Sequence, residues 1–420
     1  MAKPVKTIWL VNRYAMPPQY ESRLRTIKFA HYLREAGYDV TVFGASEMHN
    51  MDVNLITDGS KYIVRDYGDI HFVHIKTLNY NHKGSIVRTL SDILFHYRLV
   101  KISHEFSQPD LILATTYALI SDPVLSWAHR IGAKYITDTL DMWPDVFADL
   151  GLMSSSNPLF KYLIRVAKHR YEKSDACSFS LTECKKYIVN KKWDIGNGGK
   201  IDLEKVFYIN NGVDLSDFNQ WCKTNTLEDQ DLLNDKKHII YMGSIRLANG
   251  LMMAIKAAEL LKDRTDVDFL IYGDGGDRDG LIVYCHEHGL GNVIFKSKWT
   301  DPKYVPFILS HSYLNLLNYA SSGFAKYGIS SSKLFQYMAA GHPIVCNINL
   351  PSCPIAHYNI GTAKEFNSSE EYAQAIETML DLDKESYNAM CERAREAAKD
   401  FDYPYLTQKQ IDIIKWLENK

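Results

Sequence analysis

The sequence predicts an α/β protein made of two Rossmann-like, doubly wound domains that face each other across a cleft. Short apolar runs of strand type alternate with amphipathic runs of helical type, which is typical of parallel sheets covered by helices. The alternation stops at the polar stretch 219–237 and then begins again, and 420 residues are too many for one ordinary core. We therefore expect an N-terminal domain over residues 1–218, a linker over 219–237, a second domain over 238–402, and a helix over 403–420 that could dock back on the first domain.

Each half repeats the pattern in chain order. The expected strands of the first half are 7–11, 39–44, 71–76, 111–114, 135–139, 176–180 and 206–209, and its expected helices are 21–36, 86–106, 119–130 and 158–173. The expected strands of the second half are 238–243, 269–275, 293–295, 314–317 and 343–346, and its expected helices are 250–262 and the run between the serines at 330–332 and Gly341, with a last helix at 405–418. Open α/β sheets bind ligands at the carboxyl ends of their strands, so the loops after these strands are the expected functional region.

Composition excludes several classes of protein. A hydrophobic content of 46% and a charged content of 23% are those of a folded globular chain. No run of about 18 uncharged apolar residues occurs, which argues against a transmembrane helix. Seven cysteines without paired metal-type spacing favour a reduced, cytoplasmic protein and argue against zinc. The N-terminus runs directly into a strand-like segment and shows no signal-peptide core, which favours the same compartment.

Charge is unevenly distributed along the chain. Residues 1–200 hold 26 Lys and Arg against 20 Asp and Glu, whereas residues 201–420 hold 22 against 30. A nucleic-acid-binding protein would need a denser basic face than this. A mildly basic N-terminal half is instead compatible with peripheral contact with an anionic membrane.

The stretch 327–343 contains the clearest candidate site. Three serines offer N-cap hydroxyls, a helix-forming run follows, and Gly341 and Pro343 end it. A helix start carries free N–H groups and a positive dipole end, which suit a diphosphate. Lys333 lies in the first turn, where a cation gains nothing from the dipole, so a bound anion would explain its position. The alternative is a capped core helix leading into a buried strand.

Four motifs in order then resemble the GT-B glycosyltransferases of retaining family 4. They are Asn210-Asn211-Gly212-Val213-Asp214 with Phe218, Tyr241-Met242-Gly243-Ser244 with Asn249-Gly250, Tyr272-Gly273-Asp274-Gly275, and Ser332-Lys333-Leu334-Phe335-Gln336-Tyr337-Met338-Ala339-Ala340-Gly341. In the first half, Asp141-Met142-Trp143-Pro144 resembles a segment of enzymes that build bacterial surface polysaccharides.

The resemblance implies a nucleotide-sugar donor site in the second domain. The donor-binding residues that we expect from it are Gly243, Ser244, Gly273, Asp274, Gly275, Ser331, Ser332, Leu334 and Gln336. Arg246 and Lys333 are the expected cations at the leaving diphosphate. The resemblance also implies catalysis without a bound metal or other cofactor, and the chain shows no Asp-X-Asp near a strand end.

The chain departs from the family pattern at several of these positions. Two glutamates eight positions apart are common at this helix, and here those positions hold Gly328 and Gln336. A glutamine still accepts a hydrogen bond from a ribose hydroxyl, though without charge assistance. Ser244 and Asn249 lie where a basic pair is often found, and Leu140 replaces a frequent histidine.

Residues at strand ends of the first domain are the candidates for acceptor chemistry. Asp141 is the best catalytic carboxylate, although capping a turn near Trp143 is an equally good explanation of it. Arg13 and Arg23, in and beyond the loop after the first strand, could hold an acceptor phosphate. The helix 158–173 combines apolar with basic residues, as an interfacial helix for a lipid-linked acceptor would, and as an ordinary covering helix would too.

The expected function is transfer of a sugar, with retention, from a nucleotide-diphosphate-sugar to a glycan acceptor in capsule, O-antigen or exopolysaccharide synthesis. The expected acceptor is lipid-linked, and the expected location is cytoplasmic, with peripheral contact at the inner face of the plasma membrane. One alternative is a catalytically silent GT-B protein that binds nucleotide or glycan and scaffolds a partner enzyme. A lower alternative is a sugar-nucleotide epimerase, which would need an acid–base set that the sequence does not show.

Overall fold

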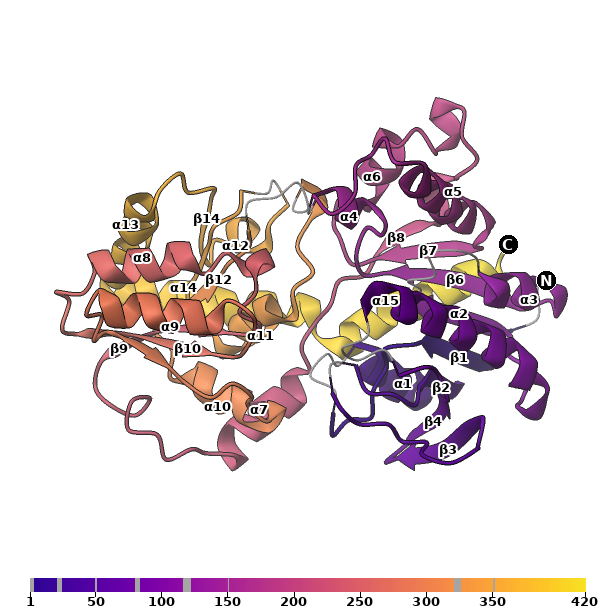
Figure 1. Cartoon of the computed structure of the whole chain (residues 1–420), viewed down its shortest axis with the longest axis horizontal. Coiled ribbons are helices and arrows are strands. Elements are labelled where there is room, and N and C mark those ends of the chain that lie inside the picture. The colour runs from indigo at the N-terminus through magenta and orange to yellow at the C-terminus, as the bar shows by residue number, and fades with distance from the viewer. Residues whose placement is uncertain are drawn as a thin grey trace. The chain divides into compact units, whose positions relative to one another are not determined.

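The computed structural model describes residues 4–20, 25–49, 51–79, 84–115, 122–149, 151–320, 326–349 and 352–420. The chain forms two compact units, the first comprising residues 1–210 with 403–420 and the second comprising residues 211–402 (Figure 1). Each is an α/β unit with its own sheet, so the expectation of two Rossmann-like domains is confirmed. Parts of the expected helices 21–36 and 119–130, namely 21–24 and 119–121, lie outside the described residues.

Unit 1 is built on a sheet with the strand order β3-β4-β2-β1-β5-β6-β7-β8. Its strands are β1 (Thr7–Asn12), β2 (Asp39–Ala45), β3 (Tyr62–Tyr67), β4 (Ile70–Ile75), β5 (Leu111–Thr115), β6 (Lys134–Thr139), β7 (Ala176–Phe179) and β8 (Val206–Tyr208). The pairings are parallel except that β3 runs antiparallel to β4 at the edge. The sequence pattern missed β3, because its burial alternates weakly and three successive residues are exposed.

Helices cover both faces of this sheet. The helices are α1 (Arg25–Glu35), α2 (Gly84–Ile102), α3 (Pro123–Arg130), α4 (Asp145–Asp149), α5 (Pro158–Lys173), α6 (Cys184–Asn190) and α15 (Tyr403–Glu418). Side chains of α1 and α15 share one hydrophobic cluster, in which Phe29 contacts Tyr403 edge-to-face at 5.9 Å. Side chains of α2 and α3 share the cluster on the other face. The C-terminal helix therefore packs on the first unit although 192 residues of the second unit precede it.

Unit 2 has a second parallel sheet with the strand order β11-β10-β9-β12-β13-β14. Its strands are β9 (Lys237–Met242), β10 (Val267–Tyr272), β11 (Val293–Phe295), β12 (Leu314–Leu317), β13 (Ile344–Cys346) and β14 (Gly361–Ala363). Its helices are α7 (Leu215–Thr224), α8 (Met252–Leu260), α9 (Arg278–Glu287), α10 (Val305–Ser310), α11 (Ser332–Ala340), α12 (Pro354–His357), α13 (Ser369–Leu380) and α14 (Lys384–Ala398).

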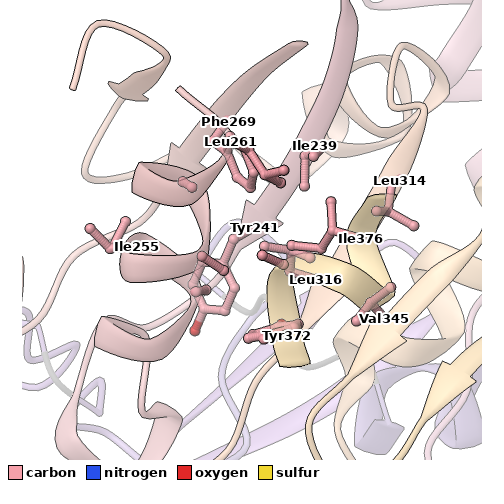
Figure 2. Close-up of a cluster of buried hydrophobic side chains, with 14 of the residues drawn as sticks. Ile239, Tyr241, Ile255, Leu261, Phe269, Leu314, Leu316, Val345, Tyr372 and Ile376 are labelled. Atoms are coloured by element: carbon pink, nitrogen blue, oxygen red, sulfur yellow. The ribbon is translucent and has the colours of Figure 1, made fainter. Parts of the chain in front are cut away.

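Two hydrophobic clusters lie on opposite faces of the second sheet. One joins the strands to α8, α9 and α13, and Figure 2 shows Tyr241 in it among side chains such as Ile255 and Tyr372. The other joins the strands to α7, α10, α11 and α14. Burial between two apolar layers explains why these strands read as continuous hydrophobic runs.

The boundary between the units differs from the sequence expectation. The division falls after Asn210 rather than after residue 218, because Val213 pairs with Asp402 and Phe218 is buried in a core of unit 2. Residues 219–237 are not an independent linker either. They include the end of α7 and the buried Leu232, and both Asp229 and Asp231 form ion pairs of 2.7 Å with Lys296.

Candidate functional site

Two loops at the carboxyl edge of the second sheet form the base of the candidate site. The backbone N–H of Gly243, directly after β9, donates to the carbonyl of Tyr272 at 3.0 Å. The N–H of Ile245 donates to the carbonyl of Asp274 at 2.8 Å, after β10. The loops that follow β9 and β10 therefore hold each other in place through backbone hydrogen bonds.

Glycine is required where these loops touch. A Cβ atom at Gly273 would lie 1.9 Å from the carbonyl oxygen of Gly243, and one at Gly275 would lie 2.1 Å from that of Ile245. Both glycines also have positive φ values, +124° and +153°, which side-chain-bearing residues rarely adopt. The glycine motif that the sequence suggested for donor binding thus has a structural cause, since it lets two loops approach at backbone distance.

The side chain of Lys333 lies over the backbone of Gly243. A Cβ at Gly243 would come within 2.7 Å of Lys333 Cδ and 3.0 Å of its Nζ. The same ammonium lies 3.1 Å from the hydroxyl oxygen of Tyr241 and 4.7 Å from the centre of its ring. Burial lowers the pKa of Lys333 to about 8, because an ammonium loses hydration there.

The start of α11 lies next to this lysine. Ser331 occupies the N-cap position with an extended backbone, but its side chain makes no capping hydrogen bond, contrary to the expectation from the serine run. Helix N–H groups without a side-chain cap are available to a ligand anion. The uncapped helix start and the ammonium of Lys333, on the first turn of the same helix, together form a cradle suited to a diphosphate.

Other predicted donor residues fall into two groups. Ser244 and Arg246 are exposed in the loop after β9, where Ser244 donates to Asn249 at 3.0 Å and Arg246 passes close to Gly275. Asp274 is exposed and lies 3.8 Å from the ammonium of Lys298. Leu334 differs, because its side chain is fully buried in the core. Leu334 therefore stays an expected donor residue only through its backbone at the start of α11, since its side chain packs that helix against the sheet.

Two further positions lie on or beside α11. Ser332 and Gln336 are partly buried, and Gln336 lies one turn after Lys333, on the same side of the helix. Gly328 has a φ of +129°, which explains a glycine at that position.

The sequence analysis missed one aromatic residue at this edge. Trp299 is 66% exposed in the loop after β11. That loop is tied to the site, because the carbonyl of Ser297 accepts a 3.0 Å hydrogen bond from the N–H of Gly273. A single exposed aromatic side chain is ordinary on a protein surface, so the interest of Trp299 lies in the loop that carries it. The sequence feature that could have pointed to Trp299 is its position four residues after the expected strand 293–295.

In unit 1 three carboxylates at or near the end of β6 differ sharply in their surroundings. Asp141 is exposed immediately after β6. Asp138 is buried and accepts two hydrogen bonds from Arg25, at 2.7 and 3.1 Å. Asp145 accepts hydrogen bonds from Tyr187 and Lys191. Of the three, Asp141 is the carboxylate that a solvent-borne substrate could reach.

Arg13 has a partly structural role. Its side chain is buried, donates to the hydroxyl of Ser91 at 2.7 Å and lies over the ring of Tyr14 at 4.8 Å. Arg88 of α2 stacks on the same ring and donates to the hydroxyl of Tyr14 at 2.9 Å. The structure therefore adds Arg88 to the predicted arginine at this edge, whereas Arg23 lies outside the described residues.

Two further aspartates of unit 1 have structural roles. Asp122 caps α3 by accepting from the N–H of Leu125, and Asp110 accepts from the N–H groups of Lys6 and Thr7. Within the described ranges no three His, Cys, Asp or Glu side chains are grouped so as to hold a metal ion. No helix in the described part of the chain is long and apolar enough to cross a membrane.

Known proteins resemble this chain in sequence and in fold. Residues 223–399 match the family "Glycosyl transferases group 1". WcaI of Escherichia coli (strain K12), whose name provisionally assigns it to colanic acid biosynthesis as a glycosyl transferase, is 26% identical over 197 residues. That match spans 45% of this chain and 46% of WcaI, so less than half of the relative is covered.

Solved structures match over almost the whole length. The sucrose-phosphate synthase of Thermosynechococcus elongatus has a TM-score of 0.71 at 14% identity, covering 98% of this chain and 99% of its own. The α,α-trehalose-phosphate synthase of Burkholderia vietnamiensis has a TM-score of 0.73 at 13% identity, covering 100% and 98%. At such low identity these neighbours establish the fold alone, and they are phosphosugar synthases. The chain thus has the GT-B fold, and its residues 223–399 are similar to the group 1 glycosyl transferases.

Proposed function

We propose that the protein is a retaining glycosyltransferase that takes its sugar from a nucleotide-diphosphate-sugar bound at the carboxyl edge of the unit 2 sheet. The observation that carries this proposal is the ammonium of Lys333 lying against the bare backbone of Gly243 at the start of α11. A diphosphate is the ligand whose size and charge suit such a cradle. A structural neighbour from E. coli, described as trehalose-6-phosphate bound with UDP-2-fluoro glucose, supports this class of donor.

The chemistry assigned to the donor site is stabilisation of the leaving group. The bond from the anomeric carbon to the diphosphate oxygen breaks, and a bond from that carbon to an acceptor oxygen forms. Negative charge develops on the departing diphosphate, where Lys333, Arg246 and the α11 N–H groups would stabilise it. The acceptor's proton passes to the departing phosphate oxygen, so this route needs no protein nucleophile and no metal.

The acceptor side of the proposal rests on unit 1. Asp141 is the reachable carboxylate and is assigned to orient the acceptor hydroxyl. Arg13 and Arg88, which both stack on Tyr14, are assigned to an acceptor phosphate. A lipid-linked acceptor at the inner face of the plasma membrane would present such a phosphate.

The finer assignment is to family 4 and to surface-polysaccharide synthesis. It is supported by the ordered sequence motifs, by the partial match to WcaI and by the segment Asp141-Met142-Trp143-Pro144. The phosphosugar synthases among the structural neighbours share the fold only, so a phosphosugar acceptor is the competing assignment.

A screen of donors and acceptors tests the proposal. Thermal unfolding is measured with UDP, GDP and dTDP and with their sugars, since a ligand at 100 times its dissociation constant stabilises by roughly 2.7 kcal/mol. Transfer is then assayed to lipid-linked glycans and, in parallel, to phosphosugars. Binding of none of these nucleotides together with turnover of none of these sugars would refute the proposal, whereas transfer to a phosphosugar alone would reject only the lipid-linked acceptor.

A further inference from the structure

An exposed apolar stripe runs along α2 of unit 1. Ile86, Leu90, Ile93 and Tyr97 are 76%, 50%, 38% and 60% exposed. Their spacing of four, three and four residues places them on one side of the helix. The opposite side of α2 is also apolar and packs on the sheet through residues such as Phe95 and Leu99. This helix is therefore apolar on both sides, although the described residues of unit 1 cover only one of them.

Charges on α2 restrict what can cover the stripe. The helix carries three cations, Arg88, Arg98 and Lys101, and a single acid, Asp92. Asp92 is buried beside His96, with 3.8 Å between its carboxylate and the imidazole. Arg98 is partly buried and donates to the carbonyl of Lys76, whereas Lys101 is exposed. The exposed charge beside the stripe is therefore positive, which complements an anionic surface.

The size and position of the stripe favour a membrane over a second copy of the chain. A stable protein interface buries roughly 800 Å² on each partner, which four side chains of one helix do not supply. Near its N-terminal end α2 also carries Arg88, one of the proposed acceptor arginines, which donates to the hydroxyl of Tyr14 from the side of the helix opposite the stripe. A bilayer in contact with the stripe would bring lipid phosphates to this end of the helix.

The helix expected to be interfacial, α5, is the weaker candidate. Of its large apolar residues, Leu159 and Tyr162 are exposed at 53% and 44%, whereas Phe160 and Leu163 are buried in the unit. Its outward side otherwise carries charged residues such as Lys161 and Arg165. It offers two apolar contacts near one end, where α2 offers four along three turns.

From these observations we infer that the outward side of α2 docks unit 1 on an anionic phospholipid bilayer, with Ile86, Leu90, Ile93 and Tyr97 entering the interfacial layer and Lys101 facing the headgroups. This inference deepens the proposed function, since it names the surface that would meet a lipid-linked acceptor. It does not require the protein to turn over a donor.

The test measures co-sedimentation of the full chain with vesicles of phosphatidylcholine and phosphatidylglycerol in equal parts. Wild type should bind these vesicles, bind pure phosphatidylcholine at least about tenfold less, and lose affinity as salt rises. The double variant Leu90→Glu, Ile93→Glu should bind the mixed vesicles at least about tenfold less tightly. The matched variant Leu159→Glu, Tyr162→Glu on α5 should bind like wild type.

Two controls distinguish a loss of vesicle binding from a loss of folding or of nucleotide binding. All four substituted side chains are exposed, so the unfolding temperature and the nucleoside-diphosphate-induced shift should equal those of wild type. Equal vesicle binding by wild type and the α2 variant, or loss in the α5 variant alone, would overturn the inference. So would a wild-type dimer that the α2 variant converts to a monomer without vesicle binding. A nucleotide-induced shift without any vesicle binding would reject docking and leave the proposed function standing.

Discussion

The ammonium of Lys333 lies 3.1 Å from the hydroxyl oxygen of Tyr241, above the face of that residue's ring. Tyr241 is wholly buried among strands and helices of unit 2, so its hydroxyl is held in place by the core (Figure 2). The lysine is thereby fixed over the glycine loop before any ligand arrives, and its burial depresses its pKa.

Nucleotide binding should weaken as pH rises through the pKa of Lys333. With that pKa at about 8 in the free protein, the charged fraction falls roughly tenfold between pH 7 and pH 9. The affinity for a nucleoside diphosphate, measured by calorimetry, should fall by a similar factor. Lys333→Arg should show a flatter profile because arginine stays charged, and superimposable profiles for the two proteins would contradict the assignment.

The Lys333 side chain should make the folded chain more stable as pH rises, although the same rise in pH weakens nucleotide binding. Its pKa is lower in the folded chain, at about 8, than its ordinary value of 10.5. Between these pH values the unfolded chain binds more protons, so this group makes the free energy of unfolding rise with pH. In Lys333→Met that contribution should vanish. Denaturant titrations at pH 8 and pH 10 should therefore show a larger rise in the free energy of unfolding for wild type than for the variant.

Replacing the loop glycines should destabilise unit 2. Gly273→Ala places a Cβ 1.9 Å from the carbonyl oxygen of Gly243 and forces a strained φ, so we expect a loss of more than about 2 kcal/mol in the free energy of unfolding. Gly276→Ala is the matched control, since no atom lies within 4 Å of a Cβ there. Equal denaturation midpoints for the two variants would show that the loops separate readily.

Trp299 should bind the nucleobase. Aromatic stacking on a base contributes about 1–3 kcal/mol, so Trp299→Ala should weaken binding of a nucleoside diphosphate by roughly fivefold or more. Inorganic pyrophosphate lacks a base and should bind both proteins equally. A parallel loss for pyrophosphate would mean that the substitution disturbs the loop at Gly273 instead.

Gln336→Glu should tighten nucleotide binding if the α11 alignment is correct. A carboxylate accepts a stronger hydrogen bond from a ribose hydroxyl than an amide does, so the affinity should rise by roughly threefold or more. A 2′,3′-dideoxynucleoside diphosphate should show no such gain. An unchanged affinity for the ribose-containing nucleotide would place Gln336 outside the donor site.

Substitution of Asp141 and Asp138 should separate chemistry from folding. Asp141→Asn should slow transfer with little effect on stability, because this side chain is exposed. Asp138→Asn should leave the buried guanidinium of Arg25 without its carboxylate and cost about 3–5 kcal/mol. Rates of transfer and urea midpoints measured on both variants test this, and undiminished transfer by Asp141→Asn would remove it from the acceptor site.

The sequence by itself determined the layered architecture and indicated which loops to expect at the donor. Alternating apolar runs specify parallel strands and covering helices because each strand is buried on both faces, and Gly243, Gly273 and Gly275 follow two of these strands. The sequence also placed Lys333 at the start of a helix. These are local features, and local periodicity and turn chemistry express them directly.

Only the tertiary structure decided which of several neighbouring side chains are buried in the core and which are exposed to solvent. Asp138 and Asp141 differ little in sequence context, yet one is buried against Arg25 and the other is exposed, because strand β6 ends between them. Leu334 is buried in the core, and the loop that carries Trp299 is joined to the glycine loop by a hydrogen bond from the N–H of Gly273 to the carbonyl of Ser297. On α2 the apolar residues occur on both sides, so periodicity could not say which side the sheet would cover. That choice is made by long-range packing, which no short stretch of sequence contains.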